Sequence, residues 1–455
     1  MRKIIQYMMM ALIAVVLASC ANDISEESTP TVKSNIRFVV DDFPMFEKPS
    51  TRTIGEEDKG KTAWAVGDEI CVKLESKELG TQTATLKYNG VKFEIQDGNS
   101  LCYLEGEPVT AYAYYAPNRR WRNGSLDFKD IFGNPNGTAE FLEATCTVHY
   151  GDNNYVDISF ANATRNYSRL RIATIPKTEI KVDADNFAPT DNPNRLYMTY
   201  TLTSDEKGNA YLYGTFYNNS IVTVKYRGAT LKTYKFSKET ENAKSYVLDA
   251  TVISANSAEE IYSAIKQEIA DGKTAIRLNL ASDAGDNEFN AIREAFENVR
   301  GYGTIDLTLI GCKEIPVNGL YRIMALKSIT LPDVTKIRMD ALSSCLYLQE
   351  ICAPNVSAID EYAFGKCRYL RKVTLGELTD VRGEANSGGG IFGVTDTGDL
   401  NIDLYLPKNQ EVMEFDENSK QHIWKPTGES YFASPDYYDN GIFLGYKFKS
   451  VKSWE

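Results

Sequence analysis

Two cysteines occupy the same place in two consecutive segments of equal length, and this spacing could serve chemistry. Residues 326–347, LKSITLPDVTKIRMDALSSCLY, and residues 348–369, LQEICAPNVSAIDEYAFGKCRY, carry Cys345 and Cys367 in the third-from-last position. Such a pair could form a disulfide, bind a metal or fill buried space as small apolar side chains. Seven cysteines besides Cys20 at irregular spacing are not a disulfide framework, and no CxxC pair is present. The sequence therefore argues against a metal site and leaves a disulfide open.

Catalytic and cofactor motifs are weak in this sequence. A Ser/His/Asp or Cys/His arrangement needs a histidine beside a nucleophile, and the two histidines, His149 and His422, lie far apart without an identifiable partner. The glycines of residues 388–393 match the dinucleotide fingerprint, but the VTDTG that follows is no helix that could hold a pyrophosphate. The acid-rich stretches lack the spacing of a calcium loop. We therefore expect no enzyme activity, no metal and no cofactor.

Cys20 is the cysteine whose neighbours indicate a modification. Arg2 and Lys3 precede a mostly apolar run that is shorter than the about 20 residues needed to span a membrane. The ending Leu-Ala-Ser-Cys at residues 17–20 resembles the lipobox of bacterial lipoproteins. This resemblance implies a signal peptide over residues 1–19 and a mature chain that starts at a lipidated Cys20. Acyl chains such as palmitate then supply the membrane attachment.

The residues after Cys20 favour a position on the cell surface. Ala21 stands where lipoproteins retained at the inner membrane commonly have Asp, and residues 20–33 form a polar, acidic, flexible tether. This tether loosely resembles the surface-export signals of Bacteroidota lipoproteins. We expect a chain held at the outer membrane by its N-terminal lipid and exposed to the outside. A net charge of −12 without a basic run argues against nucleic acid as a partner.

Residues 34–253 carry the pattern of a β-sandwich. Short runs with alternating side chains, such as VTAYAYYA at residues 109–116, are separated by polar turns. Within this stretch, TAWAVGDEICV at residues 62–72 resembles the W-x-x-G-D-x-I-x-V pattern of fimbrillin-like domains. The resemblance implies a fimbrillin-like β-sandwich domain in which Trp64 covers the edge of the sandwich.

Residues 254–455 begin with helical signals. Ser257 and Glu260 form an S-x-x-E capping box, and isoleucines follow at every fourth position on one helical face. A strand-like run comes next, and a second apolar helical face extends over about residues 287–300. These elements predict a helical cap before the next part of the chain.

A repeat of 22 residues follows the helices. Residues separated by 22 positions, here called a column, agree in type, as in Leu307, Ile329, Ile351 and Val373. A period in the low twenties is typical of a leucine-rich-repeat solenoid in which each turn contributes one short strand. The phrase ITLPDVTKI resembles BspA-like leucine-rich repeats of Bacteroidota surface proteins. The sequence thus predicts a multidomain chain with an all-β sandwich followed by a solenoid with a helical N-terminal cap.

The repeats suggest where a ligand would bind. A lipid anchor and repeats without a catalytic constellation favour an adhesin or binding module for a host or bacterial surface protein or glycan. We expect contacts on exposed residues of the repeat, such as Gln349, Glu350, Asp360 and Glu361. The many tyrosines fit strand positions first, protein interfaces second and a sugar platform third. Stacked strands lie about 4.8 Å apart, a spacing that a disulfide between Cys345 and Cys367 tolerates. Side chains in such a ladder point the same way, so we interpret this column as buried small apolar residues.

A fimbrial tip or accessory subunit is the alternative function. Fimbrillin relatives are thought to assemble by strand donation after proteolysis near the N-terminus, commonly after an arginine. Addition of a strand to an open sheet edge is physically reasonable. The resemblance makes Arg37 and Arg52 candidate cleavage sites and other fimbrial subunits candidate partners.

Overall fold

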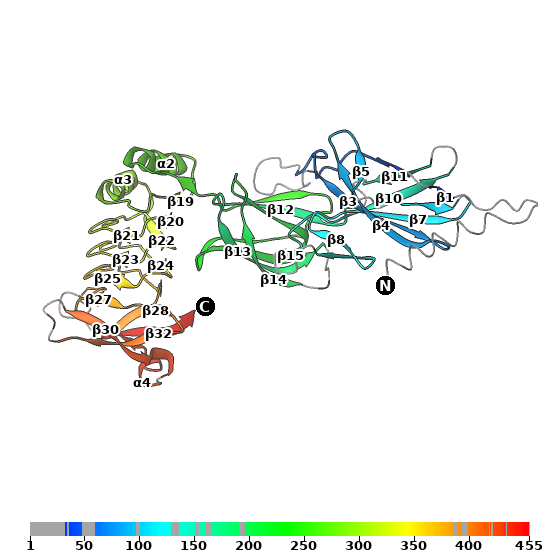
Figure 1. Cartoon of the computed structure of the whole chain (residues 1–455). Coiled ribbons are helices and arrows are strands. Elements are labelled where there is room, and N and C mark those ends of the chain that lie inside the picture. The colour runs from blue at the N-terminus through cyan, green and yellow to red at the C-terminus, as the bar shows by residue number, and fades with distance from the viewer. Residues whose placement is uncertain are drawn as a thin grey trace, which may run out of the picture.

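The structure is a computed structural model of the whole chain (Figure 1). A β-rich N-terminal half extends away from a stack of repeat turns, which carries two helices at its start (Figure 1). No helix in the described residues is long and apolar enough to cross a membrane. The predicted signal peptide, Cys20 and Arg52 lie outside the described residues, and Val32–Lys33 of the predicted tether forms strand β1. The structure describes residues 32–33, 36–47, 60–96, 101–104, 106–128, 136–150, 154–160, 165–190, 194, 196–385, 390–393, 399–417, 419, 422–433 and 435–454.

The first sheet contains, among the described residues, seven strands in the order β2-β11-β10-β7-β3-β4-β5. Neighbouring strands are antiparallel except β2, which pairs in parallel with β11. Alternate side chains such as Ile70, Val72 and Leu74 enter a common core because successive residues of a strand face opposite sides. The strands are β2 (Arg37–Val40), β3 (Glu69–Ser76), β4 (Gly80–Tyr88), β5 (Phe93–Ile95), β7 (Val109–Tyr115), β10 (Leu142–His149) and β11 (Tyr155–Ser159). Two short pairs accompany them, β1 with β6 (Tyr103–Leu104) and β8 (Arg119–Arg122) with β9 (Ser125–Phe128).

Trp64 belongs to an aromatic cluster on this first core. Its ring meets Phe43 and Phe93 edge to face, each at 4.9 Å between ring centroids. Its indole N–H donates to the carbonyl of Asp41 at 2.7 Å. The tryptophan of the W-x-x-G-D pattern therefore ties the segment after β2 to the first core.

The second sheet has, in the described part of the chain, the order β14-β13-β15-β12-β17, with β16 paired to β15. The long strand β15 pairs with β12 through its first half and with β16 through its second half. This sheet has a separate hydrophobic core. The strands are β12 (Ser168–Ala173), β13 (Glu179–Pro189), β14 (Tyr197–Thr203), β15 (Asn209–Tyr226), β16 (Ala229–Lys235) and β17 (Ser245–Asp249).

The described part of the stretch predicted as one sandwich thus contains two large sheets with distinct cores, besides the two short pairs. Alternation along a strand identifies its buried face, but it does not say which of several sheets the strand joins. The segment after β2 links the two sheets, since the backbone of Glu47 forms hydrogen bonds with Ala243 and Ser245 at 2.8 and 3.0 Å.

Two helices begin the C-terminal part, α2 (Ala258–Ala270) and α3 (Asp286–Phe296). The predicted capping box is confirmed, because the Ser257 hydroxyl accepts the Glu260 N–H while the Glu260 carboxylate accepts the Ser257 N–H. Ile261 and Ile265 are buried on the inner face of α2. Strands β18 (Ile253–Ser254) and β19 (Ala275–Asn279) connect these helices to the sheet that follows.

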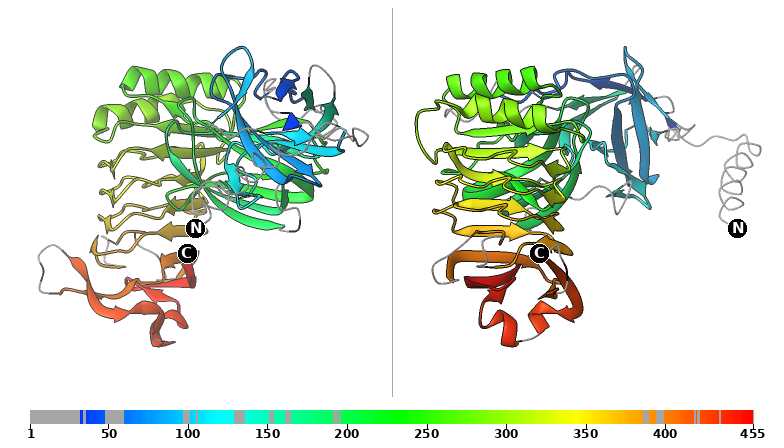
Figure 2. Two further views of the ribbon diagram at one scale, coloured as in Figure 1. Left: turned by 45° about the vertical axis from the view of Figure 1, so that its right-hand side comes forward. Right: turned by 90° about the vertical axis from the view of Figure 1, so that its left-hand side faces the viewer.

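The repeats build two sheets, which together form the stack of turns in Figure 2. Over the described residues, the larger sheet has the order β18-β19-β20-β22-β24-β26-β28-β32-β31 and the smaller has β21-β23-β25-β27-β30-β29. Ile329 pairs with Ile351, and Ile351 pairs with Val373, so the 22-residue period is the register of the larger sheet. The larger sheet adds β20 (Ile305–Ile310), β22 (Leu326–Thr330), β24 (Glu350–Ala353) and β26 (Lys372–Leu375), and the smaller begins with β21 (Glu314–Ile315), β23 (Lys336–Ile337), β25 (Ala358–Ile359) and β27 (Asp380–Arg382).

The regular register ends after β26. Lys372 pairs with Asp403, so this step is longer than 22 residues because extra chain is inserted after β27. The smaller sheet turns antiparallel where β27 meets β30, and β30 and β29 are also antiparallel. The closing elements are β28 (Asp399–Pro407), β29 (Glu411–Phe415), β30 (Ile423–Ser430), the 3-10 helix Tyr431–Ala433, α4 (Pro435–Tyr438), β31 (Ile442–Phe443) and β32 (Tyr446–Trp454).

Candidate functional site

Outward side chains of the larger repeat sheet form a polar ladder. Asp306, Ser328, Glu350 and Lys372 are successive partners in register. The Ser328 hydroxyl donates to Asp306 at 2.6 Å, and the Lys372 ammonium lies 2.6 Å from the Glu350 carboxylate. Glu350, predicted as a ligand residue, is therefore half-buried and already paired within the ladder.

Asp360 lies elsewhere and is not exposed, contrary to expectation. It follows β25 of the smaller sheet and is 9% exposed. Its carboxylate lies 3.6 Å from Arg338 and 3.6 Å from Arg382, the residues one turn before and one turn after it in the same column. The arginines of the neighbouring turns cover the aspartate, so one turn of sequence cannot reveal its burial.

The four predicted ligand residues do not share one surface. Exposed Gln349 precedes Glu350 at the entry to the larger sheet, whereas Asp360 and half-buried Glu361 follow a strand of the smaller sheet. The two sheets lie on different sides of the stack (Figure 1). The 22-residue period alone does not say where the chain bends within each turn. This bend separates Gln349 and Glu350 from Asp360 and Glu361.

The column of Cys345 and Cys367 consists of free thiols. The thiol of Cys345 donates to the carbonyl of Leu320 at 3.0 Å, and that of Cys367 donates to the carbonyl of Leu342 at 3.2 Å. Burial raises the pKa of the Cys345 thiol to about 12 and that of Cys367 well above its ordinary value. Each cysteine therefore bonds to the preceding turn as a buried neutral donor.

A third side of the stack is formed by turn segments, here defined as residues 316–325, 338–349 and 360–371. Asn318, Asp340 and Tyr362 hold the same place in these segments and share a positive φ of 55–56°. The N–H of Asp340 donates to the carbonyl of Glu361 at 3.2 Å. The turn segments thus repeat one backbone shape and stack through hydrogen bonds between turns.

A groove of about 1080 Å³ opens on the turn segments and is here called the turn-side groove. Its cationic side chains are Lys366, Arg368 and Arg371, and its carboxylates are Asp340 and Asp399. The other lining residues carry hydroxyl, amide, thiol, aromatic and aliphatic groups: Asn318, Tyr321, Ser343, Ser344, Tyr362, Phe364, Gly365, Cys367, Leu370, Phe392, Gly393, Leu400, Asn401 and Ile402.

Three tyrosines stack along the edge of the same turn segments. The rings of Tyr302 and Tyr347 are parallel within 5° at 4.9 Å, and those of Tyr347 and Tyr369 within 7° at 5.4 Å. Tyr302 and Tyr369 are 66% and 52% exposed. The intervening turn carries the small Ala325 in the column of Tyr347, so Tyr302 stacks directly on Tyr347.

The turn-side groove and the tyrosine stack were not among the predicted site residues. The 22-residue spacing of Tyr347 and Tyr369 is a signal that could have found two of the three rings. Tyr302 lies outside that spacing, and the groove cations have no basic counterpart in the preceding repeat, where Ser344, Leu346 and Gln349 hold their places. Sequence periodicity therefore pointed only partly to this surface.

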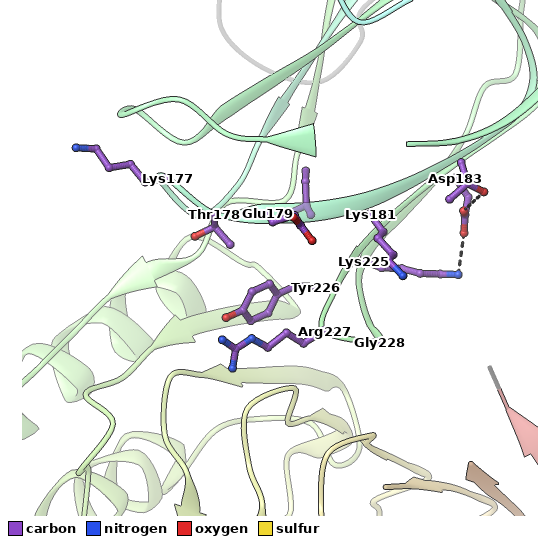
Figure 3. Close-up of a pocket in the computed structure, with 11 residues that line it drawn as sticks. Lys177, Thr178, Glu179, Lys181, Asp183, Lys225, Tyr226, Arg227 and Gly228 are labelled. Atoms are coloured by element: carbon purple, nitrogen blue, oxygen red, sulfur yellow. Dashed lines mark hydrogen bonds and ion pairs between the residues drawn. The ribbon is translucent and has the colours of Figure 1, made fainter. Parts of the chain in front are cut away.

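A second pocket, of about 770 Å³, is lined by residues of the second β-sheet (Figure 3). Its floor includes β13 and the β15–β16 hairpin, and several lysines surround it. Lys225 pairs with Asp183 at 2.7 Å, and Lys177 pairs with Glu206 at 2.9 Å, so both lysines are already paired with carboxylates. Arg227 in its lining contacts the repeats, so this pocket lies beside the junction between the two halves.

The tip of the β15–β16 hairpin makes that junction. Arg227 forms an ion pair with the buried carboxylate of Asp333 in the repeats. The other oxygen of Asp333 accepts the N–H of Gly311 at 2.9 Å. The Asn355 amide donates to the carbonyl of Arg227 at 3.2 Å. One hairpin turn is thus bonded to two repeat turns.

Arg37, a predicted cleavage site, has a defined place. Arg37 begins the edge strand β2, is exposed, and its guanidinium lies 5.7 Å from the ring centroid of Tyr155. No group of three or more His, Cys, Asp or Glu side chains arranged for a metal ion occurs in the described part of the chain.

Comparison with known proteins identifies the repeat. Residues 290–388 match the family model of the BspA type leucine rich repeat region, in six copies. This confirms the predicted repeat type over that stretch, while the fimbrillin-like resemblance of residues 34–253 stays a prediction. The comparison with curated proteins finds no match.

Two solved structures resemble the chain over about half its length. A candidate cell adhesion protein from Bacteroides fragilis has 11% identity and a TM-score of 0.24, covering 48% of this chain and 93% of its own. The shaft pilin SpaA from Lactobacillus rhamnosus GG has 12% identity and a TM-score of 0.18, covering 49% of this chain and 97% of its own. Similarity at this level carries no argument about function.

Proposed function

We propose that this protein is a lipid-anchored outer-membrane surface protein that acts as an adhesin or binding module. Residues 254–455 form its ligand-displaying unit, a leucine-rich-repeat solenoid capped by α2 and α3. The N-terminal β-domains hold this unit away from the membrane. The partner is a protein or glycan on a host or bacterial surface.

The observation that carries this proposal is the stack of BspA-type repeats with side chains in fixed columns. Stacked turns with a continuous core offer an extended and rigid surface, and solenoid proteins use such surfaces for binding. Side chains ordered before binding lose less entropy when a partner docks. The stacked repeats are therefore suited to binding a partner through a preformed surface.

Deletion of residues 254–455 tests this function. The truncated protein is expected to reach the cell surface in normal amount, since the N-terminal signals are intact, and to lose binding to host or bacterial cells. Surface amount is measured by antibody on whole cells, and binding by a cell-adhesion assay. Unchanged adhesion by the truncated protein would refute the proposed role of the repeats.

Lipidation at Cys20 is part of the same proposal and has its own test. Cys20→Ala should abolish incorporation of a labelled palmitate analogue and release the protein from the membrane fraction, because no acyl chain remains to be buried. Cys71→Ala serves as a matched control at a buried cysteine of strand β3. Equal labelling of Cys20→Ala and the unaltered chain would contradict lipidation at this residue.

A fimbrial tip or accessory subunit is the second candidate. It is supported by Arg37, an exposed arginine at the start of the edge strand β2. Cleavage there would separate β1 from the rest of the chain and alter the edge of the first sheet. N-terminal mass spectrometry of the surface protein distinguishes the candidates: a start at Cys20 favours the tethered form, and a start after Arg37 or Arg52 favours the fimbrial one.

A further inference from the structure

We propose that the turn-side groove, with the open face of Tyr369 at its rim, binds an acidic glycan, a sugar polymer that carries carboxylate or sulfate groups. This inference rests on the proposed binding function and specifies its ligand class. It places the ligand on the turn segments rather than on the strand face of the larger sheet.

The cations of the groove have no carboxylate partner. Lys366, Arg368 and Arg371 are exposed, and none of them forms an ion pair with an acidic side chain in the described residues. By contrast, Lys372 on the adjacent strand is paired with Glu350. Against these three cations the groove has two carboxylates, Asp340 and Asp399, so a chain of net charge −12 has an excess of positive charge at this groove. The cations suit an anion, because charge-assisted hydrogen bonds are the stronger ones.

The Arg371 side chain is held in place by backbone carbonyls of its own segment. The Arg371 guanidinium donates to the carbonyls of Leu370 at 2.7 Å and of Arg368 at 3.3 Å. This folds the Arg371 side chain back toward residue 368 and leaves its remaining N–H groups available. Arginine presents its donors in a planar fork that matches carboxylate and sulfate-like oxygens.

The tyrosine stack provides an aromatic platform beside these cations. One face of Tyr369 is covered by Tyr347, and its other face has no aromatic neighbour among the described residues. Tyr369 lies between groove residues Arg368 and Leu370 in the chain. The apolar C–H face of a pyranose packs on such a ring, and the stack below it keeps the ring in place.

The remaining lining favours a sugar over a protein segment. Hydroxyls of Tyr321, Ser344 and Tyr362 and the exposed amide of Asn401 can both donate and accept hydrogen bonds. The carboxylate of Asp340 can accept bonds from sugar hydroxyls. A protein ligand would instead favour a larger apolar centre. Groups that both donate and accept hydrogen bonds, together with three cations, fit an anion that carries many hydroxyl groups.

The test is isothermal titration calorimetry of the full chain with three polymers: heparin for sulfate groups, polygalacturonate for carboxylate groups and dextran as the neutral probe. We expect binding to at least one acidic polymer, weaker binding as salt is raised, and no binding to dextran. The acidic polymer that binds identifies the charged group. Equal binding of dextran, or no binding of either acidic polymer, would overturn the proposal.

Variants locate the site. Arg368→Ala together with Arg371→Ala should weaken binding at least about tenfold, and Tyr369→Ala about fivefold. Arg120→Ala with Arg122→Ala is the matched control, because it removes the same charge from exposed positions of the β8–β9 hairpin. Circular dichroism melts verify that each variant is folded. An equal loss in the control pair would mean unspecific charge attraction and would refute the site.

These outcomes are separate from those of the truncation test. If deletion of residues 254–455 abolishes cell adhesion but the groove variants and acidic polymers have no effect, the glycan site is wrong and the binding function stands. If a purified protein ligand is found whose binding requires Arg368 and Arg371, the groove is a protein interface and the glycan class is refuted. If the truncated chain adheres normally, the proposed function itself fails.

Discussion

The thiols of Cys345 and Cys367 are expected to be unreactive in the folded protein. Each is buried or nearly so and donates to a carbonyl of the preceding turn, and burial keeps the pKa of both thiols high, so little thiolate is present at neutral pH. N-ethylmaleimide at pH 7 should leave both unmodified in the native chain. In guanidinium without reductant both should be modified, as peptide mass spectrometry can measure. Failure of both to react after unfolding would indicate a disulfide between them.

Asp403 should make the free energy of unfolding depend on pH in the acidic range. Hydrogen bonds from Ser450 and Lys449 hold the pKa of the Asp403 carboxyl below its ordinary value. The contribution of the ionised Asp403 carboxylate to the free energy of unfolding is fully present above the ordinary pKa of about 4. It is lost as the pH falls through the lower pKa of the folded state.

Asp403→Asn is therefore expected to lower the free energy of unfolding by about 1 kcal/mol at pH 7. The difference from the unaltered chain should shrink as the pH is lowered from 5 to 3. Urea denaturation at a series of pH values measures it. A difference that stays constant over this range would contradict the role of the ionised carboxylate.

At the scale of elements, the arginine–aspartate column holds consecutive turns of the smaller sheet together. Asp360→Ala removes the carboxylate that lies between Arg338 and Arg382 and leaves both guanidinium groups without it. We expect a loss of about 1–3 kcal/mol in the free energy of unfolding, since charged partners are left poorly compensated. Chemical denaturation provides the measurement.

Asp380→Ala is the control for this column. Asp380 is half-buried and lies 3.7 Å from Arg382 at the sheet surface. Exposed ion pairs contribute little, so its loss should cost less than about 1 kcal/mol. Equal costs for the two substitutions would show that burial of Asp360 adds nothing.

At the scale of the whole molecule, the hairpin tip at Arg227 is one of the contacts between the repeats and the β-domains. Arg227→Ala should loosen the junction with Asp333 without unfolding either half, because each has its own core. Small-angle X-ray scattering is expected to show a broader distribution of intramolecular distances. Arg122→Ala, on the distant β8–β9 hairpin, should scatter like the unaltered chain. Unchanged scattering of Arg227→Ala would mean that other contacts hold the junction.

Much of the local structure followed from spacing along the chain. The Ser257 capping box, the strand within residues 109–116 and the 22-residue register appear in the structure as the short-range pattern predicts. The column of Cys345 also has the predicted character of buried small side chains. These features depend on residues near one another in sequence or on a constant period, and both can be read directly from the amino-acid order.

Contacts between distant segments were decided only by the tertiary structure. The division of residues 34–253 between two cores, the burial of Asp360 and the stacking of Tyr302 on Tyr347 each depend on which segments become neighbours. The turn-side groove likewise needs side chains from several turns at once. Periodicity tells which side of an element is buried, but the partner across a sheet, groove or junction depends on the path of the whole chain.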